Sequence, residues 1–122
     1  MIFGIGTDVV QLDRIERAFE RFGEHFVRRL LLPEEEQAFR ANRRPARFLA
    51  MRFAAKEAVV KAMWIRDVGV VQNEWGKPEI VWSDRGDKMR RRLGIGSGHV
   101  SLTDEAGLVV AIAVLLQEPS AT

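Results

Sequence analysis

The 122-residue chain contains no cysteine, and it has only two histidines and four prolines. The absence of cysteine excludes disulfide bonds, thiolate metal sites and cysteine nucleophiles, and it fits a reducing compartment. The longest apolar run, from Leu108 to Leu116, is far too short to span a membrane, and the first residues lack the pattern of a signal peptide. We therefore expect a soluble, cytoplasmic protein that does not bind membranes.

Charge of one sign does not dominate the chain. The formal net charge is +2. Residues 1–66 carry 13 Lys and Arg against 9 Asp and Glu, whereas residues 67–122 carry 6 against 8. Arginine makes up most of the basic set, and its planar guanidinium suits carboxylate and phosphate partners. Because acidic residues are interleaved throughout, this pattern is more typical of solvated helix surfaces than of a nucleic-acid site.

The most informative segment is the apolar stretch RFLAMRFAAKEAVVKAMW at residues 47–64, which carries four charged side chains in its interior. At about 100° per residue, Arg52 and Lys56 fall on one stripe of a helix, and Glu57 and Lys61 fall on another. A helix that is apolar nearly all round is normally buried, and unpaired charge there costs on the order of several kcal/mol. These side chains must therefore reach partners: each other, a metal ion or an anionic ligand in a cleft.

The remaining local signals define helices and strands. Helices are predicted at residues 12–22, 33–42, 47–64 and 84–93. Strands are predicted at residues 1–10, 68–71, 79–82, 99–103 and 108–116. Gly23 ends the first helix, Ser83 or Asp84 caps the last one, and the GIGSG segment at 94–98 is predicted to be a loop. The final strand is an unbroken apolar run, so we expect it to be buried on both faces.

This order of elements predicts the fold class. Strands at both ends flank a helical block, and two hairpins complete the chain. We expect a single α+β domain over residues 1–122, with a mostly antiparallel sheet packed against a long buried helix and shorter helices. A chain of this length buries roughly two-thirds of its unfolded surface, which is enough for a real core.

The first strand places Gly4, Gly6 and Asp8 on one face, because side chains alternate along a strand. The two glycines leave room for another backbone or a ligand to approach Asp8 closely. An equally good alternative makes Asp8 the N-cap of the helix that follows.

Asp8 and Glu57 are the two acids in the most apolar segments. Two oxygen ligands with open positions suit Mg²⁺, which retains waters and accepts phosphate oxygens, whereas zinc or iron would need histidine or cysteine alongside. Arg52, Lys56 and Lys61 would then hold phosphate charge and stabilise the charge that develops during phosphoryl transfer. The residues alone favour the simpler alternative, in which Glu57 and Lys61 pair across one helical turn.

Four motifs occur along the chain in order: GIGTDVV, RFAAKEAVVKA, GKP, and HVSLTDEAG ahead of the final apolar strand. In this order and spacing the chain resembles the holo-[acyl-carrier-protein] synthases, a family of 4'-phosphopantetheinyl transferases, over essentially its whole length. The specific part is the pair GTDxV and RFAAKEA. The resemblance implies an Mg²⁺-dependent enzyme that moves the 4'-phosphopantetheine arm of coenzyme A onto a serine of apo acyl carrier protein and releases 3',5'-ADP. Such an enzyme serves fatty-acid or polyketide synthesis.

The resemblance also implies a role for individual positions. Asp8 and Glu57 match the magnesium ligands, and together with Lys61 they are the expected catalytic residues. Arg14 and Arg21 match the helix that docks the acidic carrier protein. The residues expected to contact coenzyme A are Arg52, Lys56, Lys61, Lys77, Pro78, His99 and Thr103.

The nucleophile belongs to the carrier protein, so this chain must supply only a proton acceptor. We expect Glu57 or a magnesium-bound water in this role, with Asp104 as a lesser candidate, and we expect His99 to be structural or to bind phosphate. The chain departs from the family pattern in two places. The connection after Met63 lacks a glycine-containing loop, and Asp104 stands where many members have histidine.

Members of the family are typically trimers, and the resemblance implies an active site between subunits, with Asp8 and the KEA helix contributed by different chains. Two other classes of function compete with this interpretation. One is a non-catalytic phosphate or nucleic-acid module that uses the arginines, including the run at residues 90–92, although aromatic residues are not interleaved there. The other is a structural oligomer in which the charges of the KEA helix only form salt bridges.

Overall fold

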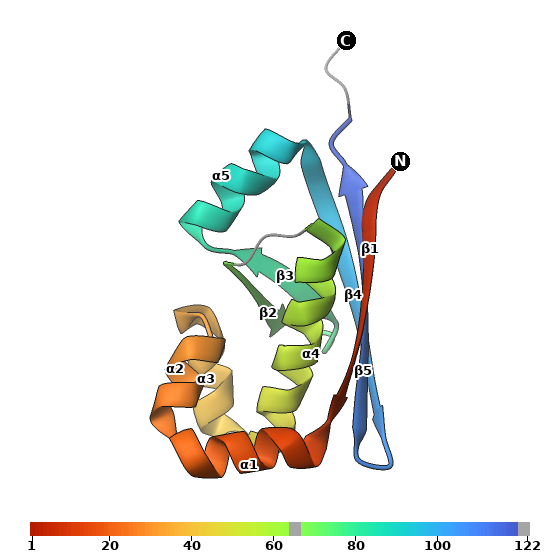
Figure 1. Ribbon diagram of the computed structural model, residues 1–122. Coiled ribbons are helices and arrows are strands. Elements are labelled where there is room, and N and C mark those ends of the chain that lie inside the picture. Colours follow the sequence, from red (N-terminus) through yellow and green to blue (C-terminus); the bar gives the residue numbers. More distant parts are fainter. Residues whose placement is uncertain (64–66, 120–122) are drawn as a thin grey trace.

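A three-stranded antiparallel sheet forms one side of the molecule, and a long helix lies against one of its faces (Figure 1). The computed structural model describes residues 1–63 and 67–119. The strands are β1 (Ile2–Gln11), β2 (Val68–Gln72), β3 (Pro78–Trp82), β4 (Ile95–Glu105) and β5 (Leu108–Gln117). The helices are α1 (Leu12–Phe22), α2 (Glu24–Leu30), α3 (Pro33–Ala41), α4 (Pro45–Met63) and α5 (Asp84–Leu93). The predicted α+β class is confirmed.

The core lies between α4 and the sheet of order β1-β5-β4. In β1, Gly4 and Gly6 face the helix. A Cβ atom at Gly4 would lie 2.1 Å from the carbonyl oxygen of Ala62, and one at Gly6 would lie 1.8 Å from that of Ala58. The prediction that these glycines admit a second backbone is therefore confirmed, and that backbone belongs to α4.

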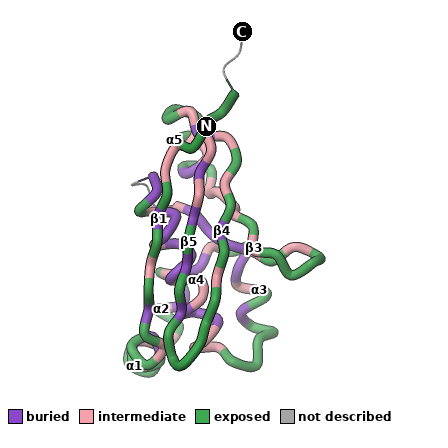
Figure 2. The backbone as a smooth tube through the Cα atoms, turned by 90° about the vertical axis from the view of Figure 1, so that its right-hand side faces the viewer, coloured by how far each residue is buried: buried purple, intermediate pink, exposed green. Residues whose placement is uncertain are grey.

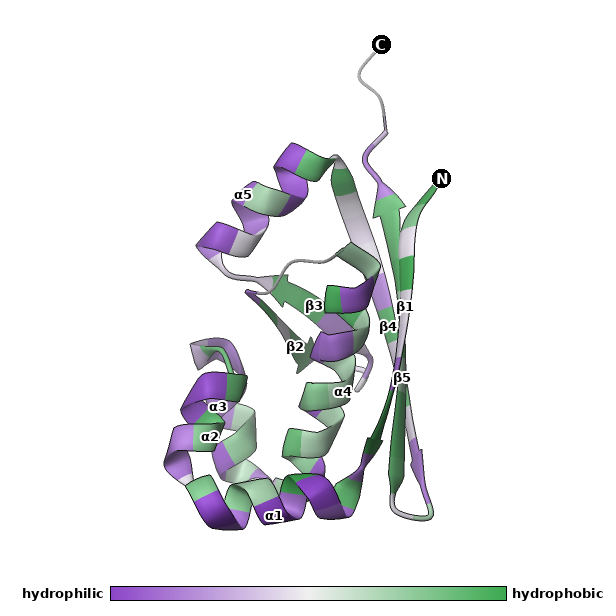
Figure 3. Cartoon of the chain, viewed as in Figure 1, coloured by the Kyte–Doolittle hydropathy of each residue, from purple (hydrophilic) through white to green (hydrophobic). Residues whose placement is uncertain are grey.

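The apolar residues of α4 explain its burial. Leu49, Ala54 and Val59 are fully buried, and the helix carries buried residues on most of its circumference. Figure 3 shows hydrophobic residues along the strands and along much of α4, whereas α1, α2 and α5 carry many hydrophilic residues. Among the described helices, none is long and apolar enough to cross a membrane.

The predicted hairpin and its neighbouring helix are present. Strands β2 and β3 pair antiparallel and form a separate two-stranded sheet. Ser83, one of the two predicted caps, is the N-cap of α5, and its hydroxyl oxygen accepts a hydrogen bond of 3.0 Å from the backbone N–H of Gly86. The predicted end of α1 at Gly23 is also confirmed, with φ of 54° at that residue.

Two expectations about secondary structure are wrong, and one helix was not predicted. Helix α2 was not predicted, because its seven residues are too few for a periodic pattern. The GIGSG segment is mostly strand, since β4 begins at Ile95 and is irregular up to Gly98, where it still pairs with β5. Strand β5 is buried on one face only, because α4 covers a single face of the sheet; Leu108, Val110 and Ile112 are exposed on the other (Figure 2).

Candidate active site

Lys61 and Asp8, 53 residues apart in the chain, form an ion pair where α4 crosses β1. The ammonium nitrogen of Lys61 lies 2.9 Å from Oδ1 of Asp8 and donates a second hydrogen bond, of 3.1 Å, to the carbonyl oxygen of Thr7. The hydrogen bond with Asp8 raises the pKa of Lys61, and the charge of Glu57 acts in the same direction. Lys61 therefore lies in the electrostatic field of both acids that the sequence singled out.

The N-terminus of α1 tests the alternative in which Asp8 is the N-cap of that helix. The residue that caps α1 is Gln11, so the alternative in which Asp8 is the N-cap is wrong. Oδ2 of Asp8 is buried and has no hydrogen-bond partner among the described residues. A carboxylate oxygen in this situation is costly unless something binds it.

The position of Asp8 corrects one implication of the resemblance. We expected Asp8 and the KEA helix to come from different chains. Instead, the close approach of β1 and α4 at Gly4 and Gly6 brings Asp8 to Lys61 within one chain. Asp8 and Lys61 of the KEA helix therefore contact each other within a single protomer.

Arg52 and Lys56 have a partner that the sequence did not reveal, the fully buried carboxylate of Glu35. Lys56 Nζ lies 2.5 Å from Oε1 of Glu35, and Arg52 Nε lies 3.6 Å from Oε2. Burial lowers the pKa of both cations, and the charge of Glu35 offsets part of this effect. Two cations against one carboxylate leave the cluster with an excess positive charge. Their predicted contact with coenzyme A stays a prediction.

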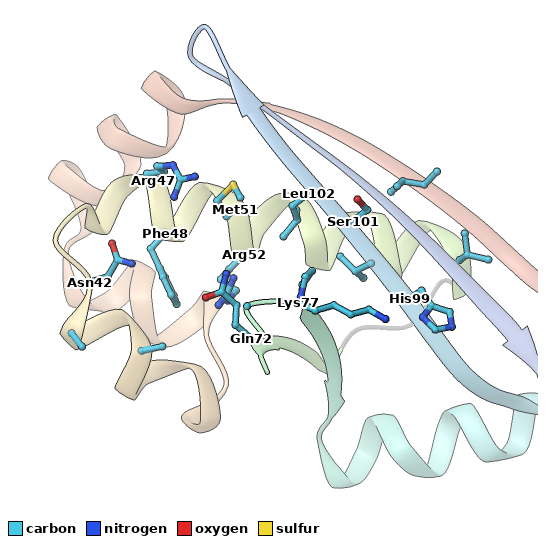
Figure 4. Close-up of a pocket in the computed structure, with 17 residues that line it drawn as sticks. Asn42, Arg47, Phe48, Met51, Arg52, Gln72, Lys77, His99, Ser101 and Leu102 are labelled. Atoms are coloured by element: carbon cyan, nitrogen blue, oxygen red, sulfur yellow. The ribbon is translucent and has the colours of Figure 1, made fainter. Parts of the chain in front are cut away.

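A cleft of about 860 Å³ runs from α3 and α4 past the β2–β3 hairpin to β4, and we call it the larger cleft. Four residues predicted to contact coenzyme A line it together: Arg52, Lys77, Pro78 and His99. Figure 4 shows Lys77 and His99 approaching it from the hairpin and from β4. The sequence reasoning missed Arg47, which lines the same cleft near the start of α4. These cations suit an elongated, anionic ligand.

Asp104, the lesser candidate for the proton acceptor, lies at the end of β4. Asp104 forms a two-pronged ion pair with Arg47, with both N–O distances 2.8 Å. The hydrogen bonds from Arg47 lower the pKa of Asp104. A carboxylate held in this way is a weak proton acceptor, which counts against Asp104 as the base. Thr103 is exposed on β4, two residues from Ser101, which lines the larger cleft.

A second cleft, of about 630 Å³, lies between α2 and α4, and we call it the smaller cleft. Lys56 and Glu57 line one side of it, and Arg28 and Arg29 line another. Its apolar lining includes Phe22 at the end of α1, which is 51% exposed. Glu57 thus faces a recess with a basic rim and an apolar floor.

The residues predicted to bind the carrier protein lie on the exposed side of α1. Arg14 and Arg21 are both exposed, and the guanidinium of Arg21 lies 5.2 Å from the centre of the Phe22 ring. Arg17, on the same side, pairs with Asp13 at 3.8 Å. The shortened connection after Met63 falls on residues 64–66, outside the described residues.

Residues 4–113 match the 4'-phosphopantetheinyl transferase superfamily, and the chain belongs to this family. A holo-[acyl-carrier-protein] synthase of Thiobacillus denitrificans is 42% identical over 100% of this chain and 98% of that protein. The holo-[acyl-carrier-protein] synthase of Neisseria meningitidis has a crystal structure that is 38% identical, with a TM-score of 0.91, and covers 96% of this chain and 100% of that chain. The Helicobacter pylori enzyme, in complex with coenzyme A, is 28% identical with a TM-score of 0.79, and covers 92% of this chain and 99% of that chain. The predicted family is confirmed.

Proposed function

We propose that this protein is a holo-[acyl-carrier-protein] synthase, which transfers the 4'-phosphopantetheine group of coenzyme A to apo acyl carrier protein and releases 3',5'-ADP. The observation that carries the proposal is the position of Lys61, which pairs with Asp8 at the crossing of β1 and α4 and also interacts electrostatically with Glu57. Family membership and the similarity to a structure that holds coenzyme A support the choice of donor.

The larger cleft is proposed to hold the ribose-phosphate end of the donor; neither Asp8 nor Glu57 lines it, so the pyrophosphate extends from the cleft toward these two acids. Coenzyme A is a long, strongly anionic molecule with a pyrophosphate and a further phosphate on its ribose. Arg47, Arg52 and Lys77 line the cleft with cations, and His99 adds ring nitrogens that can hydrogen-bond a phosphate. These cations, on α4 and on the β2–β3 hairpin, suit a donor that carries several phosphates.

Asp8 and Glu57 are the proposed magnesium ligands. The unpartnered oxygen of Asp8 fits this role, and carboxylate oxygens are the ligands that Mg²⁺ prefers. Within residues 1–63 and 67–119, no three acidic or histidine side chains gather closely enough to hold an ion by themselves. Oxygens of the donor and water must therefore complete the shell. When bound, the ion neutralises phosphate charge and draws electron density from the phosphorus.

The reaction forms one bond and breaks one bond at phosphorus. The hydroxyl oxygen of the carrier serine bonds to the phosphorus that carries the pantetheine arm, and the bond from that phosphorus to the bridging oxygen breaks, so that 3',5'-ADP leaves with the electron pair. The serine proton passes to a base, for which we propose either the oxygen of Glu57 that does not bind the ion or a water beside it. Lys61 stabilises negative charge beside the two acids.

The carrier protein is proposed to dock on α1 and α2. Arg14, Arg21, Arg28 and Arg29 are exposed there and would attract an acidic partner, so association should slow as salt rises. The smaller cleft beside these arginines opens toward Glu57. A serine-bearing helix seated on this surface would bring its hydroxyl to the proton acceptor.

We further propose that the protein is a homotrimer in which each larger cleft is completed by a neighbour. The face of the sheet that α4 does not cover carries Ile5, Val9, Val110 and Ile112, which are 39–61% exposed. Ile112 and Val114 on this face also line the larger cleft. An apolar face of this extent favours burial against a second copy of the chain.

The test is incubation of the protein with coenzyme A, Mg²⁺ and apo acyl carrier protein, followed by mass spectrometry of the carrier. We expect the carrier to gain the mass of one phosphopantetheine group, and we expect chelation of divalent ions to abolish the gain. Asp8→Ala and Glu57→Ala should each lower the rate by at least about 100-fold while circular dichroism is retained. Arg92→Ala, an exposed residue of α5, is the control. A carrier of unchanged mass would contradict the proposal.

A further inference from the structure

Glu35 is the one fully buried carboxylate among the described residues, and neither the motifs nor the family comparison drew attention to it. It sits in the first turn of α3, where its Oε1 accepts a hydrogen bond of 2.8 Å from the backbone N–H of Leu32. Its Oε2 accepts another, also of 2.8 Å, from the backbone N–H of Val70 in β2. The carboxylate is thus fixed by two elements of the backbone before any charged side chain reaches it.

Space for this carboxylate is built into β2. A Cβ atom at Gly69 would lie 2.9 Å from Oε1 of Glu35, so a larger residue there would displace the carboxylate. Lys56 and Arg52, one turn apart on α4, both turn toward it. The groups that contact the carboxylate through a hydrogen bond or an ion pair are all donors or cations.

Arg52 is held from a second side by an aromatic ring. Its guanidinium carbon lies 4.3 Å from the centre of the Phe48 ring, and both side chains line the larger cleft (Figure 4). The Nε edge of the guanidinium faces Glu35 at 3.6 Å. This contact is an ion pair without a hydrogen bond, because Nε has no hydrogen-bond partner among the described residues. An arginine held by this charge and by its ring contact keeps its two terminal nitrogens for an outside anion.

We propose that Glu35 is a positioning residue for donor binding: together with Phe48 it fixes Arg52 at the wall of the larger cleft, in place to meet a phosphate of the donor. This inference rests on the proposed function. A preset arginine loses less side-chain freedom on binding than a mobile one does, so the benefit appears in the affinity for the nucleotide. Glu35 itself does not touch the donor.

The experiment is a double-mutant cycle on the affinity for 3',5'-ADP, measured by calorimetry with Glu35→Gln, Arg52→Gln and the double variant. We expect Glu35→Gln to weaken binding by about tenfold and Arg52→Gln to weaken it at least as much, with the double variant no weaker than Arg52→Gln alone. Glu34→Gln, an exposed charge removal on the same helix, is the matched control and should change affinity by less than about twofold.

A purely structural role predicts something else: a lower melting temperature and a smaller active fraction, with an unchanged dissociation constant in the molecules that remain folded. That result, or losses that multiply in the double variant, would overturn the proposal. If Glu35→Gln does not fold, Gly69→Ala displaces the carboxylate while it preserves every charge, and it must weaken nucleotide binding at least about threefold. A wild-type protein that binds neither 3',5'-ADP nor coenzyme A would overturn both this inference and the proposed function. If the wild type binds the nucleotide and Glu35→Gln binds it equally well, only this inference is overturned.

Discussion

At the scale of single residues, the partners of the charged side chains of α4 could be predicted only in part. The sequence showed that four charged side chains in an apolar helix need partners, and Lys61 does reach Asp8. It did not show that Glu35 is the partner of Arg52 and Lys56. Glu35 lies among three consecutive glutamates that open a helix, a pattern that the helix dipole alone explains. Only the packing of α3 against β2 and α4 distinguishes it from Glu34 and Glu36.

The ion pair between Arg47 and Asp104 predicts a pH effect on stability. The pKa of Asp104 in the folded protein lies below its usual value of about 3.8. Its contribution to the free energy of unfolding is therefore present above that value and lost as the pH falls through the folded pKa. Because both side chains are about one-third exposed, we expect less than about 1 kcal/mol.

The measurement is urea unfolding of the wild type and Asp104→Asn at pH 6 and at a series of lower pH values, at one protein concentration. The difference between the two proteins should be constant above about pH 5 and shrink below about pH 4. In an Arg47→Gln background the same substitution should produce no such change. A difference that grows on acidification would show that the pair does not act as described.

At the scale of elements, predictions made from local pattern held wherever one element carries its own signal. Neighbouring residues along the chain determine three features: the helical period of α1, the turn of the β2–β3 hairpin and the serine cap of α5. The residues of β5 do not determine whether one of its faces is exposed, because this exposure depends on how many layers cover the sheet. The residue pattern alone also did not predict that Lys77, Pro78 and His99 share a cleft. These residues lie on the β2–β3 hairpin and on β4, which α5 separates along the chain, so only the resemblance suggested a common site.

The contact between β1 and α4 is the element-scale feature on which the site depends. In Gly6→Ala the new methyl group would meet the carbonyl oxygen of Ala58, so the helix must move away from the strand. We expect the free energy of unfolding to fall by about 2 kcal/mol or more and transferase activity to fall with it, because Asp8 and Lys61 separate. Urea unfolding and the carrier assay measure the two effects.

Gly98→Ala is a matched control for this prediction. It adds the same methyl group to another strand, where the nearest atoms are the ends of the Leu115 and Ile80 side chains, at 2.5 and 2.8 Å. Such side chains can change rotamer, whereas the α4 backbone cannot, so the cost should be smaller. Equal losses in the two variants would contradict the account of the crossing.

At the scale of the whole molecule, the uncovered face of the sheet predicts an oligomer. The central row of this face runs from Val9 through Val110 to Thr103, as the strand register shows. We expect the wild type to sediment as a trimer and Val110→Glu to sediment as a monomer, because a charge would be buried without a partner. Monomers should also bind coenzyme A more weakly, since Ile112 and Val114 of the same face line the larger cleft.

Leu93→Glu is the control, because Leu93 in α5 is 40% exposed and Val110 is 39% exposed. The two substitutions add the same charge at equally exposed apolar positions, so only a specific interface distinguishes them. A wild type that sediments as a monomer, or a trimer that survives Val110→Glu, would show that another surface or no surface joins the subunits.

We propose that Asp8 and Glu57 of one protomer hold a divalent cation together with the pyrophosphate of coenzyme A. The most direct measurement is a crystal structure of the protein grown with Mn²⁺ and coenzyme A, with the ion located by its anomalous scattering. We predict one peak within bonding distance of a carboxylate oxygen of Asp8, a carboxylate oxygen of Glu57 and a phosphate oxygen of the donor. A donor bound with its pyrophosphate away from these two acids, and no metal between them, would contradict the account.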